Sequence, residues 1–373
     1  MTLKRRTALL LFSLVVASAC QPQASGPRPG ATPGIAGSAT APAAEVAPSA
    51  TATPTPTDLE LLRPYTIAGL RERNFPATRI VVGALKTKTD VFRRYAISYR
   101  SDGLSVAGMM QIPVEGRAPF PVIVMNHGFF NRAEYHSGDG TDRAAEYLNR
   151  HGYLTLSSDY RSWGASAIGP SLYYSGLVID VVNLMDGAAS IQEADASRIG
   201  LWGHSMGGGV TMKVLMLKTP AKAAVLYSTV SADDADILGR WGLGCIGDIA
   251  AGEHQLDCNS SDVIPLELPP DVIQAYYKAS LDSNALRETS PIYHLDLVSV
   301  PIQIHFGTED GKTSAGTPPE WSHKLYQALE AAGKSAEIFG YDGELHSFNG
   351  DAWIAFMERS ARFFDQYVKN ADH

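Results

Sequence analysis

The chain has 373 residues, of which 45% are hydrophobic and 19% are charged. This length can hold one large α/β domain or two smaller ones, and the composition allows a sizeable core. The formal net charge of −8 argues against a nucleic-acid-binding protein, because no basic face is available to neutralise phosphates. The acidic balance points to no particular protein partner, and the sequence leaves the oligomeric state open.

Residues 1–20 are typical of a bacterial lipoprotein signal. A positive segment at 4–6 precedes an apolar stretch at 8–17 that is too short to span a bilayer. Small residues then lead to Cys20, as in a lipobox, although Ala17 stands where leucine is usual. We expect export and a lipid anchor at Cys20 on the extracytoplasmic face of a membrane. Secretion after cleavage near the same alanines is the alternative.

Residues 21–57 are rich in Pro, Ala, Thr, Ser and Gly and have almost no large apolar side chain. Such a segment cannot bury enough surface to offset its chain entropy, so a disordered tether is expected. The folded domain is expected to span 58–373, with the lipid anchor as its only link to the membrane.

The rest of the chain predicts an antiparallel opening followed by alternating strands and helices. Strands are expected at 79–86, 92–99, 104–112, 121–125, 153–157, around 199–201, and at 223–227, 301–306 and 336–341. Helices are expected at 142–150, 180–191, 206–217, 318–332 and 353–368. This order predicts an α/β fold with a mostly parallel, doubly wound sheet and helices on both faces.

Residues 231–289 interrupt the alternation. Long insertions of this kind are usually functional loops, so we expect a cap over the site, with an irregular structural excursion as the alternative. The insertion contains Cys245 and Cys258, which are expected to form a disulfide in an exported protein; two separate buried thiols are the alternative. No CxxC or HExxH spacing suggests a metal, and no cofactor is expected.

The motif Gly203-His-Ser-Met-Gly207 lies between a short strand and an apolar helix. A strand, a sharp Gly-x-Ser-x-Gly turn and a helix together form a nucleophile elbow, in which small neighbours leave the backbone room to bend. Ser205 is therefore the predicted nucleophile. A glycine-rich turn with an incidental serine is the alternative.

In folds that carry this elbow, the acid and then the histidine follow the serine along the chain, each after a strand. His346 follows the last expected strand, whereas His323 lies in a helical pattern and His373 is terminal. His346 is therefore the predicted base. Asp310, in the turn after the 301–306 strand, is the predicted acid. Glu309 is the runner-up, and an aspartate at 233, 234 or 236 is a more distant choice.

The oxyanion of such a reaction needs two backbone donors. They are expected from Met206, directly after the nucleophile, and from Phe129, in the loop after the 121–125 strand. His127 in that loop is expected to be a structural hydrogen bonder. Aromatic residues near strand ends either line the acyl pocket or belong to the core: Phe129, Phe130, Tyr160 and Trp163.

From about residue 97 to 367 the chain resembles the catalytic domain of the prolyl oligopeptidase family, in the α/β-hydrolase superfamily. The resemblance rests on the joint order of short motifs at 101–103, 122–128, 152–153, 159–161, 198–200, 290–292, 307–310 and 343–348. By this resemblance Ser205, Asp310 and His346 match the family's catalytic triad. Residues 58–97 are too few for the family's β-propeller. Similar single-domain relatives are esterases and dienelactone-type hydrolases.

Together these patterns predict an exported serine hydrolase that cleaves a peptide or an ester bond through an acyl-enzyme. A carboxylesterase acting on small esters is the alternative. A catalytically silent hydrolase fold used for binding is a further alternative, which the presence of all three triad residues disfavours.

Overall fold

The structure is a computed structural model that describes residues 56–243, 261–265 and 267–370. Within these residues it contains a nine-stranded sheet in the order β1-β2-β3-β5-β4-β6-β7-β8-β9. The strands are β1 Val81–Lys88, β2 Phe92–Ser101, β3 Leu104–Pro113, β4 Phe120–Asn126, β5 Leu154–Ser158, β6 Ala194–His204, β7 Ala221–Tyr227, β8 Ile302–Gly307 and β9 Ala336–Tyr341. Strands β1, β2, β3 and β5 pair antiparallel, and every pairing from β5 to β9 is parallel.

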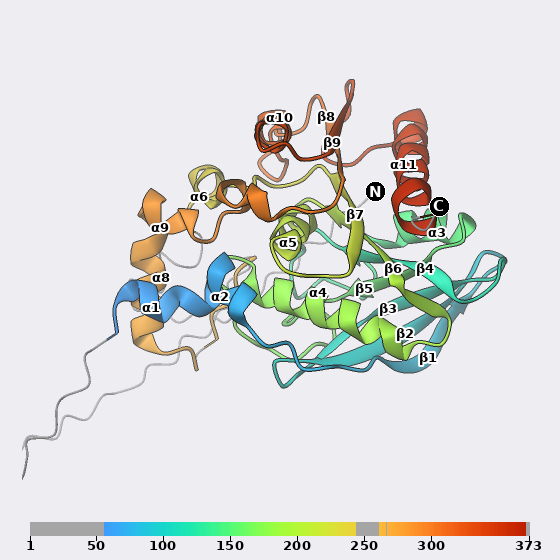
Figure 1. Cartoon of the computed structure of the whole chain (residues 1–373), viewed down its shortest axis with the longest axis horizontal. Helices are drawn as coiled ribbons and strands as arrows, with labels where there is room; N and C mark the ends of the chain where they lie inside the picture. Colours follow the sequence, from blue (N-terminus) through green and yellow to red (C-terminus); the bar gives the residue numbers. More distant parts are fainter. Residues whose placement is uncertain (1–55, 244–260, 266, 371–373) are drawn as a thin grey trace, which may run out of the picture. The chain divides into compact units, whose positions relative to one another are not determined.

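Helices cover both faces of the parallel part of the sheet. They are α3 Asp142–Arg150, α4 Ser175–Gly187, α5 Met206–Leu215, α10 Pro319–Ala331 and α11 Gly350–Phe364. Helices α4, α5 and α10 pack on one face, and α3 and α11 pack on the other (Figure 1). Because both faces are covered, the central strands are apolar throughout, and every residue of β4 is buried. The predicted α/β fold with its antiparallel opening is confirmed.

Two helices differ from their expected bounds by three or more residues at both ends, α4 and α11. The helix expected at 180–191 begins at Ser175 and ends at Gly187, followed by a 3-10 turn at Ala188–Ser190. Every residue of α4 except Asp186 is buried, so the apolar periodicity that marks an amphipathic helix is missing there. The last helix ends at Phe364 and continues as a π-helical turn, Asp365–Lys369.

The insertion at 231–289 contributes α6 Asp234–Trp241, α8 Pro270–Ser280 and α9 Ser283–Arg287. Two short helices that precede the sheet, α1 Asp58–Leu62 and α2 Ile67–Glu72, belong to the same domain. Helix α1 lies beside α8 (Figure 1), and its Leu62 joins a buried cluster with apolar residues of α8. The insertion therefore shares a small apolar core with α1 and with Leu172 and Tyr173.

Several predictions concern residues outside the described part of the chain: the signal at 1–20 with Cys20, most of the tether, and the pair Cys245 and Cys258. They stay predictions from the sequence. Across the described ranges, no helix is both long enough and apolar enough to cross a bilayer.

A buried ion pair joins α5 to the start of the insertion. The Lys213 ammonium lies 2.9 Å from the Asp234 carboxylate, and these side chains are 3% and 6% exposed. Lys213 also donates to the carbonyl oxygen of Tyr173 at 2.8 Å, and Thr289 donates to Asp234 at 2.6 Å. The charges are thus paired and hydrogen-bonded, as burial requires.

We expect Lys213→Met to lower the free energy of unfolding by about 3–5 kcal/mol, because it leaves the buried Asp234 charge without its partner. The matched control is Lys278→Met, which breaks an ion pair with Asp58 whose side chains are 61% and 50% exposed. That change should cost about 0–1 kcal/mol. Urea unfolding measures both values. Equal losses of unfolding free energy in the two variants would contradict a larger contribution from the buried ion pair.

Candidate active site

Ser205 lies at the junction of β6 and α5 in a strained backbone conformation, with φ 57° and ψ −123°. Its N–H donates to the carbonyl oxygen of Tyr227 at 2.9 Å, and its own carbonyl accepts from the Gly208 N–H at 2.9 Å. A positive φ outside glycine is uncommon and persists only where surrounding contacts impose it. The conformation is that of a nucleophile elbow.

The glycines around Ser205 are required by close backbone approach. A Cβ on Gly207 would lie 2.0 Å from the carbonyl oxygen of Asn126, at the end of β4. A Cβ on Gly203 would lie 2.4 Å from the carbonyl oxygen of Gly207. Because both contacts are to backbone, no side-chain movement can relieve them, and only glycine fits.

The loops after β8 and β9 bring Asp310 and His346 together. His346 Nδ1 lies 3.0 Å from Asp310 Oδ2, and the Asp310 side chain is 1% exposed. The same carboxylate accepts from the Thr317 N–H and hydroxyl and from the Gly311 N–H at 2.8–2.9 Å. Burial alone would raise the pKa of Asp310, but the imidazole and these donors lower it below its ordinary value. The carboxylate is therefore ionised and fixed.

Ser205 and His346 line one cavity of about 910 Å³ at the carboxyl ends of the parallel strands. The Ser205 hydroxyl makes no hydrogen bond to any group in the described part of the chain. Such contacts commonly tighten only when substrate is bound. All three predicted triad residues thus lie at one site, with the histidine–aspartate contact already formed.

Met206 and Phe129, the expected oxyanion donors, also line this cavity. Neither backbone N–H donates to another group among the residues described. The Phe129 loop passes close to the nucleophile, since a Cβ on Gly128 would lie 3.1 Å from the Ser205 Cβ. The two N–H groups are therefore available to a ligand beside Ser205.

His127, in the same loop, is fully buried and structural. Its ring nitrogens lie 2.7 Å from the carbonyl oxygen of Gly128 and 3.3 Å from that of Asp159. The ring stacks on Tyr135 at 4.6 Å and packs against Tyr160 at 4.4 Å. Burial lowers its pKa to about 4, so the ring is neutral near pH 7.

Of the four aromatic residues considered for the acyl pocket, Phe129 and Phe130 line the cavity. Tyr160 and Trp163 do not: both are fully buried, so the pocket prediction is wrong for them and the core alternative holds. Trp163 Nε1 donates to the carbonyl oxygen of Phe130 at 3.0 Å. These two rings therefore hold the loop at 127–130, which contains Phe129.

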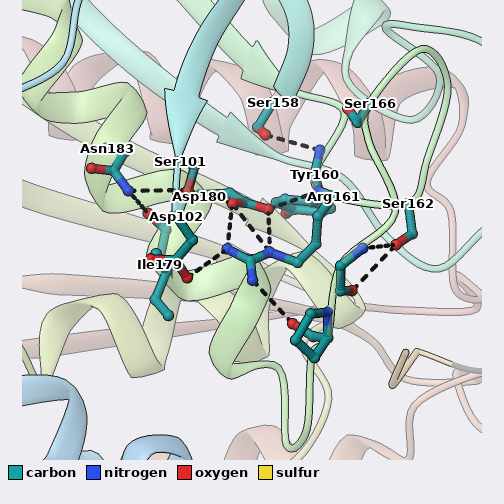
Figure 2. Close-up of polar contacts among 12 residues, drawn as sticks. Ser101, Asp102, Ser158, Tyr160, Arg161, Ser162, Ser166, Ile179, Asp180 and Asn183 are labelled. Carbon is teal, nitrogen blue, oxygen red and sulfur yellow. Dashed lines mark hydrogen bonds and ion pairs between the residues drawn. The ribbon is translucent and has the colours of Figure 1, made fainter. Parts of the chain in front are cut away.

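Figure 2 shows the polar network that holds the turn carrying Tyr160. The Arg161 guanidinium lies 2.8 Å from Asp180 on α4, with these side chains 2% and 0% exposed, and 3.2 Å from Asp102. Ser101 donates to Asp180 at 2.6 Å. The network joins the β2–β3 turn, the turn after β5 and α4. The sequence analysis did not predict this network as a support of the site, although Ser101, Asp102 and Arg161 lie in two of the motifs that carry the family resemblance.

The insertion supplies much of the remaining cavity wall. The sequence predicted a cap here but not which of its residues line the cavity. The described lining is mainly aromatic and aliphatic, with serine, histidine and aspartate side chains and no lysine or arginine. Beyond the residues already described, it includes Tyr174, Ile237, Leu238, Trp241, Asp262 and Tyr276. The Asp262 carboxylate accepts the N–H groups of Tyr173 and Tyr174 at 2.9 and 3.2 Å. Within the described ranges no group of three or more His, Cys, Asp or Glu is placed to hold a metal ion.

Comparisons with known proteins agree with this geometry. Residues 117–281 match the family described as "Serine aminopeptidase, S33". The fold is similar to acylaminoacyl peptidase from Pyrococcus horikoshii, with TM-score 0.57 and 19% identity over 76% of this chain and 43% of that one. It is also similar to an acetyl xylan esterase from Paenibacillus sp. R4, with TM-score 0.57 and 17% identity over 84% of this chain and 95% of that one. The chain has the α/β-hydrolase fold.

Among curated relatives, the chain is similar to lysophosphatidylserine lipase ABHD12 of Xenopus tropicalis, with 31% identity over 113 residues. The match spans 29% of this chain and 28% of that protein. The chain thus spans less than a third of the length of this relative, and well under half of the Pyrococcus peptidase. The resemblance to prolyl oligopeptidase catalytic domains and to esterases is confirmed at the level of the fold.

We expect Gly207→Ala to lower esterase activity at least about a hundredfold, because its Cβ would displace the elbow, and misplacing reacting groups by about 1 Å costs about 10²-fold. The matched control is Gly239→Ala in α6, whose Cβ would meet no atom within 4 Å. The control should keep its activity and gain up to about 1 kcal/mol from helix propensity. Equal activity of the two variants would contradict the steric account.

Proposed function

We propose that Ser205, His346 and Asp310 form a catalytic triad that transfers an acyl group from a carboxylic ester or amide to water. The observation that carries the proposal is the buried contact between Asp310 and His346 Nδ1, at the cavity where Ser205 occupies a nucleophile elbow. His346 accepts the Ser205 proton as Oγ attacks the carbonyl carbon. It then donates that proton to the leaving alcohol or amine, and water cleaves the acyl-enzyme by the reverse sequence.

The charges of the site support these roles. A hydrogen bond from Nδ1–H to the ionised Asp310 places the imidazole lone pair on Nε2, where a base needs it. The carboxylate also stabilises the imidazolium that forms when the serine proton is taken up. The Met206 and Phe129 N–H groups would hold the oxyanion, and each such donor is worth about 10²–10³-fold in rate.

The cavity favours an uncharged substrate with an apolar acyl group. Its volume of about 910 Å³ lies in the range of small-molecule sites, and its described walls are mainly aromatic and aliphatic. No lysine or arginine of the described lining could pair with an acyl-side carboxylate or phosphate. We therefore propose a neutral ester as the preferred substrate, with peptide amides as the competing class. Rates on p-nitrophenyl esters and on dipeptide amides of matched acyl groups distinguish the two.

Ser205→Ala should lower kcat on a p-nitrophenyl ester by about 10⁶-fold, the size of effect that follows loss of a catalytic serine. Its thermal midpoint should stay close to that of the wild type, since the elbow backbone is kept. The control is Ser105→Ala, at an exposed position of β3, which should be fully active. Residual activity of the Ser205 variant above about a tenth of wild type would refute the nucleophile.

The activity should fall on acidification, because an imidazole that has taken up a proton can no longer act as a base. His127 and His204, with pKa values lowered to about 4 and about 3, stay neutral at neutral and weakly acidic pH. Burial raises the pKa of Asp159 to about 6, so the profile is also measured in Asp159→Asn. The acid limb should persist in that variant. A kcat/KM profile that is flat down to pH 4 would count against a histidine base.

A further inference from the structure

His204, the last residue of β6 and the residue directly before Ser205, contacts the loop that carries His346. Its Nε2 lies 3.1 Å from the backbone carbonyl oxygen of His346. A carbonyl oxygen only accepts, so Nε2 carries the proton and donates. The His204 ring stacks on Tyr227 at 4.4 Å and lies 4.8 Å from the His346 ring.

A second contact holds the same loop from the neighbouring strand. The Phe348 N–H donates to the hydroxyl of Tyr227, the last residue of β7, at 2.5 Å. The Phe348 ring packs edge-on against Tyr227 at 4.6 Å, and both side chains are buried. The backbone on either side of Ser347 is therefore tied to the ends of β6 and β7, which also position Ser205.

We propose that His204 is a positioning residue for the base: its Nε2–H fixes the backbone of His346 relative to Ser205, while Asp310 fixes the ring. The inference rests on the proposed triad and adds a fourth residue to it. Asp310 alone leaves the imidazole free to move with its loop. Because His204 is adjacent to Ser205 in the chain, its hydrogen bond to His346 connects the base to the nucleophile through a single peptide bond.

The chemistry of His204 suits this role and excludes the role of the base. Its Nε2–H is already engaged by a carbonyl oxygen. Burial, together with the neighbouring His346, lowers the pKa of His204 to about 3. The ring therefore stays neutral when His346 becomes an imidazolium 4.8 Å away. A permanent cation at position 204 would oppose that charge in a site of low dielectric.

Two substitutions separate the donor from the ring. His204→Phe keeps an aromatic ring against Tyr227 but removes the hydrogen bond, whereas His204→Gln keeps an N–H donor without the ring. Both are compared on a p-nitrophenyl ester in the full chain, with thermal midpoints recorded. We expect His204→Phe to lower kcat by about 10²-fold, as a displaced catalytic group does, with KM changed less than about threefold. His204→Gln should recover at least about tenfold of that loss.

Tyr227→Phe removes the second contact and keeps the ring. Because both contacts hold the same loop, the losses in kcat for His204→Phe and Tyr227→Phe should not multiply in the double variant. If His204 had only a structural role, His204→Phe would lower the thermal midpoint, but its loss in kcat would multiply with that of Tyr227→Phe. His204→Gln would then not restore kcat.

The outcomes are distinct from those for the triad itself. Wild-type kcat in His204→Phe would overturn the positioning role while leaving the proposed function intact. Loss as complete as in His346→Ala would also overturn it, because His204 would then be acting as the base. If the wild-type chain turns over no activated ester, the proposed function fails and the inference fails with it.

Discussion

Ser205 is held in its strained conformation because the backbones of β4, β6 and α5 approach too closely for any side chain to lie between them. The contacts that a Cβ would make at Gly203 and Gly207, at 2.4 and 2.0 Å, are all to backbone oxygen atoms or to a single buried hydroxyl. The strain is maintained by packing of the whole central sheet, which is buried on both faces. The backbone conformation of Ser205 therefore depends on the packing of the sheet, which prevents the elbow from relaxing.

The other groups of the site come from loops after different strands. Because they are far apart in the sequence, polar contacts between the loops hold them together. The loops after β8 and β9 meet through Asp310 and His346, and the β9 loop is tied to β6 and β7 through His204 and Tyr227. In the loop at 127–130, the carbonyl oxygen of Phe130 accepts a hydrogen bond from Trp163. Each contact is buried or partly buried, where hydrogen bonds are strong and a lost partner is costly.

The strands along the chain and the residues that meet at the cavity could be predicted because both follow from local patterns. The parallel strands are short apolar runs, Ser205 has an elbow motif with correct flanks, and the partners must follow later strands in order. The cavity wall could not be predicted in this way. Tyr160 and Trp163 follow a strand but are buried, because a long-range ion pair between Arg161 and Asp180 fixes their turn.

The insertion shows the same limit. Trp241 and Tyr276 line the cavity and contact residues outside the insertion: Trp241 donates to the carbonyl oxygen of Ser314, and Tyr276 packs against Tyr173. No periodicity in the sequence identifies residues of that kind. The start of α4 was missed for the opposite reason, since a helix buried on all sides shows no polar face. Local pattern predicts which element a residue occupies, while packing between distant elements decides what that residue faces.

The central claim is that Ser205 is a nucleophile activated by His346. Its most direct test is labelling of the folded chain with a fluorophosphonate, followed by mass spectrometry of the digested protein. The account predicts one phosphonate per chain, on the peptide that contains Ser205, and at least about a hundredfold slower labelling in His346→Ala, since a general base contributes about 10²–10⁴-fold. Labelling at another residue, or none in folded protein, would contradict it.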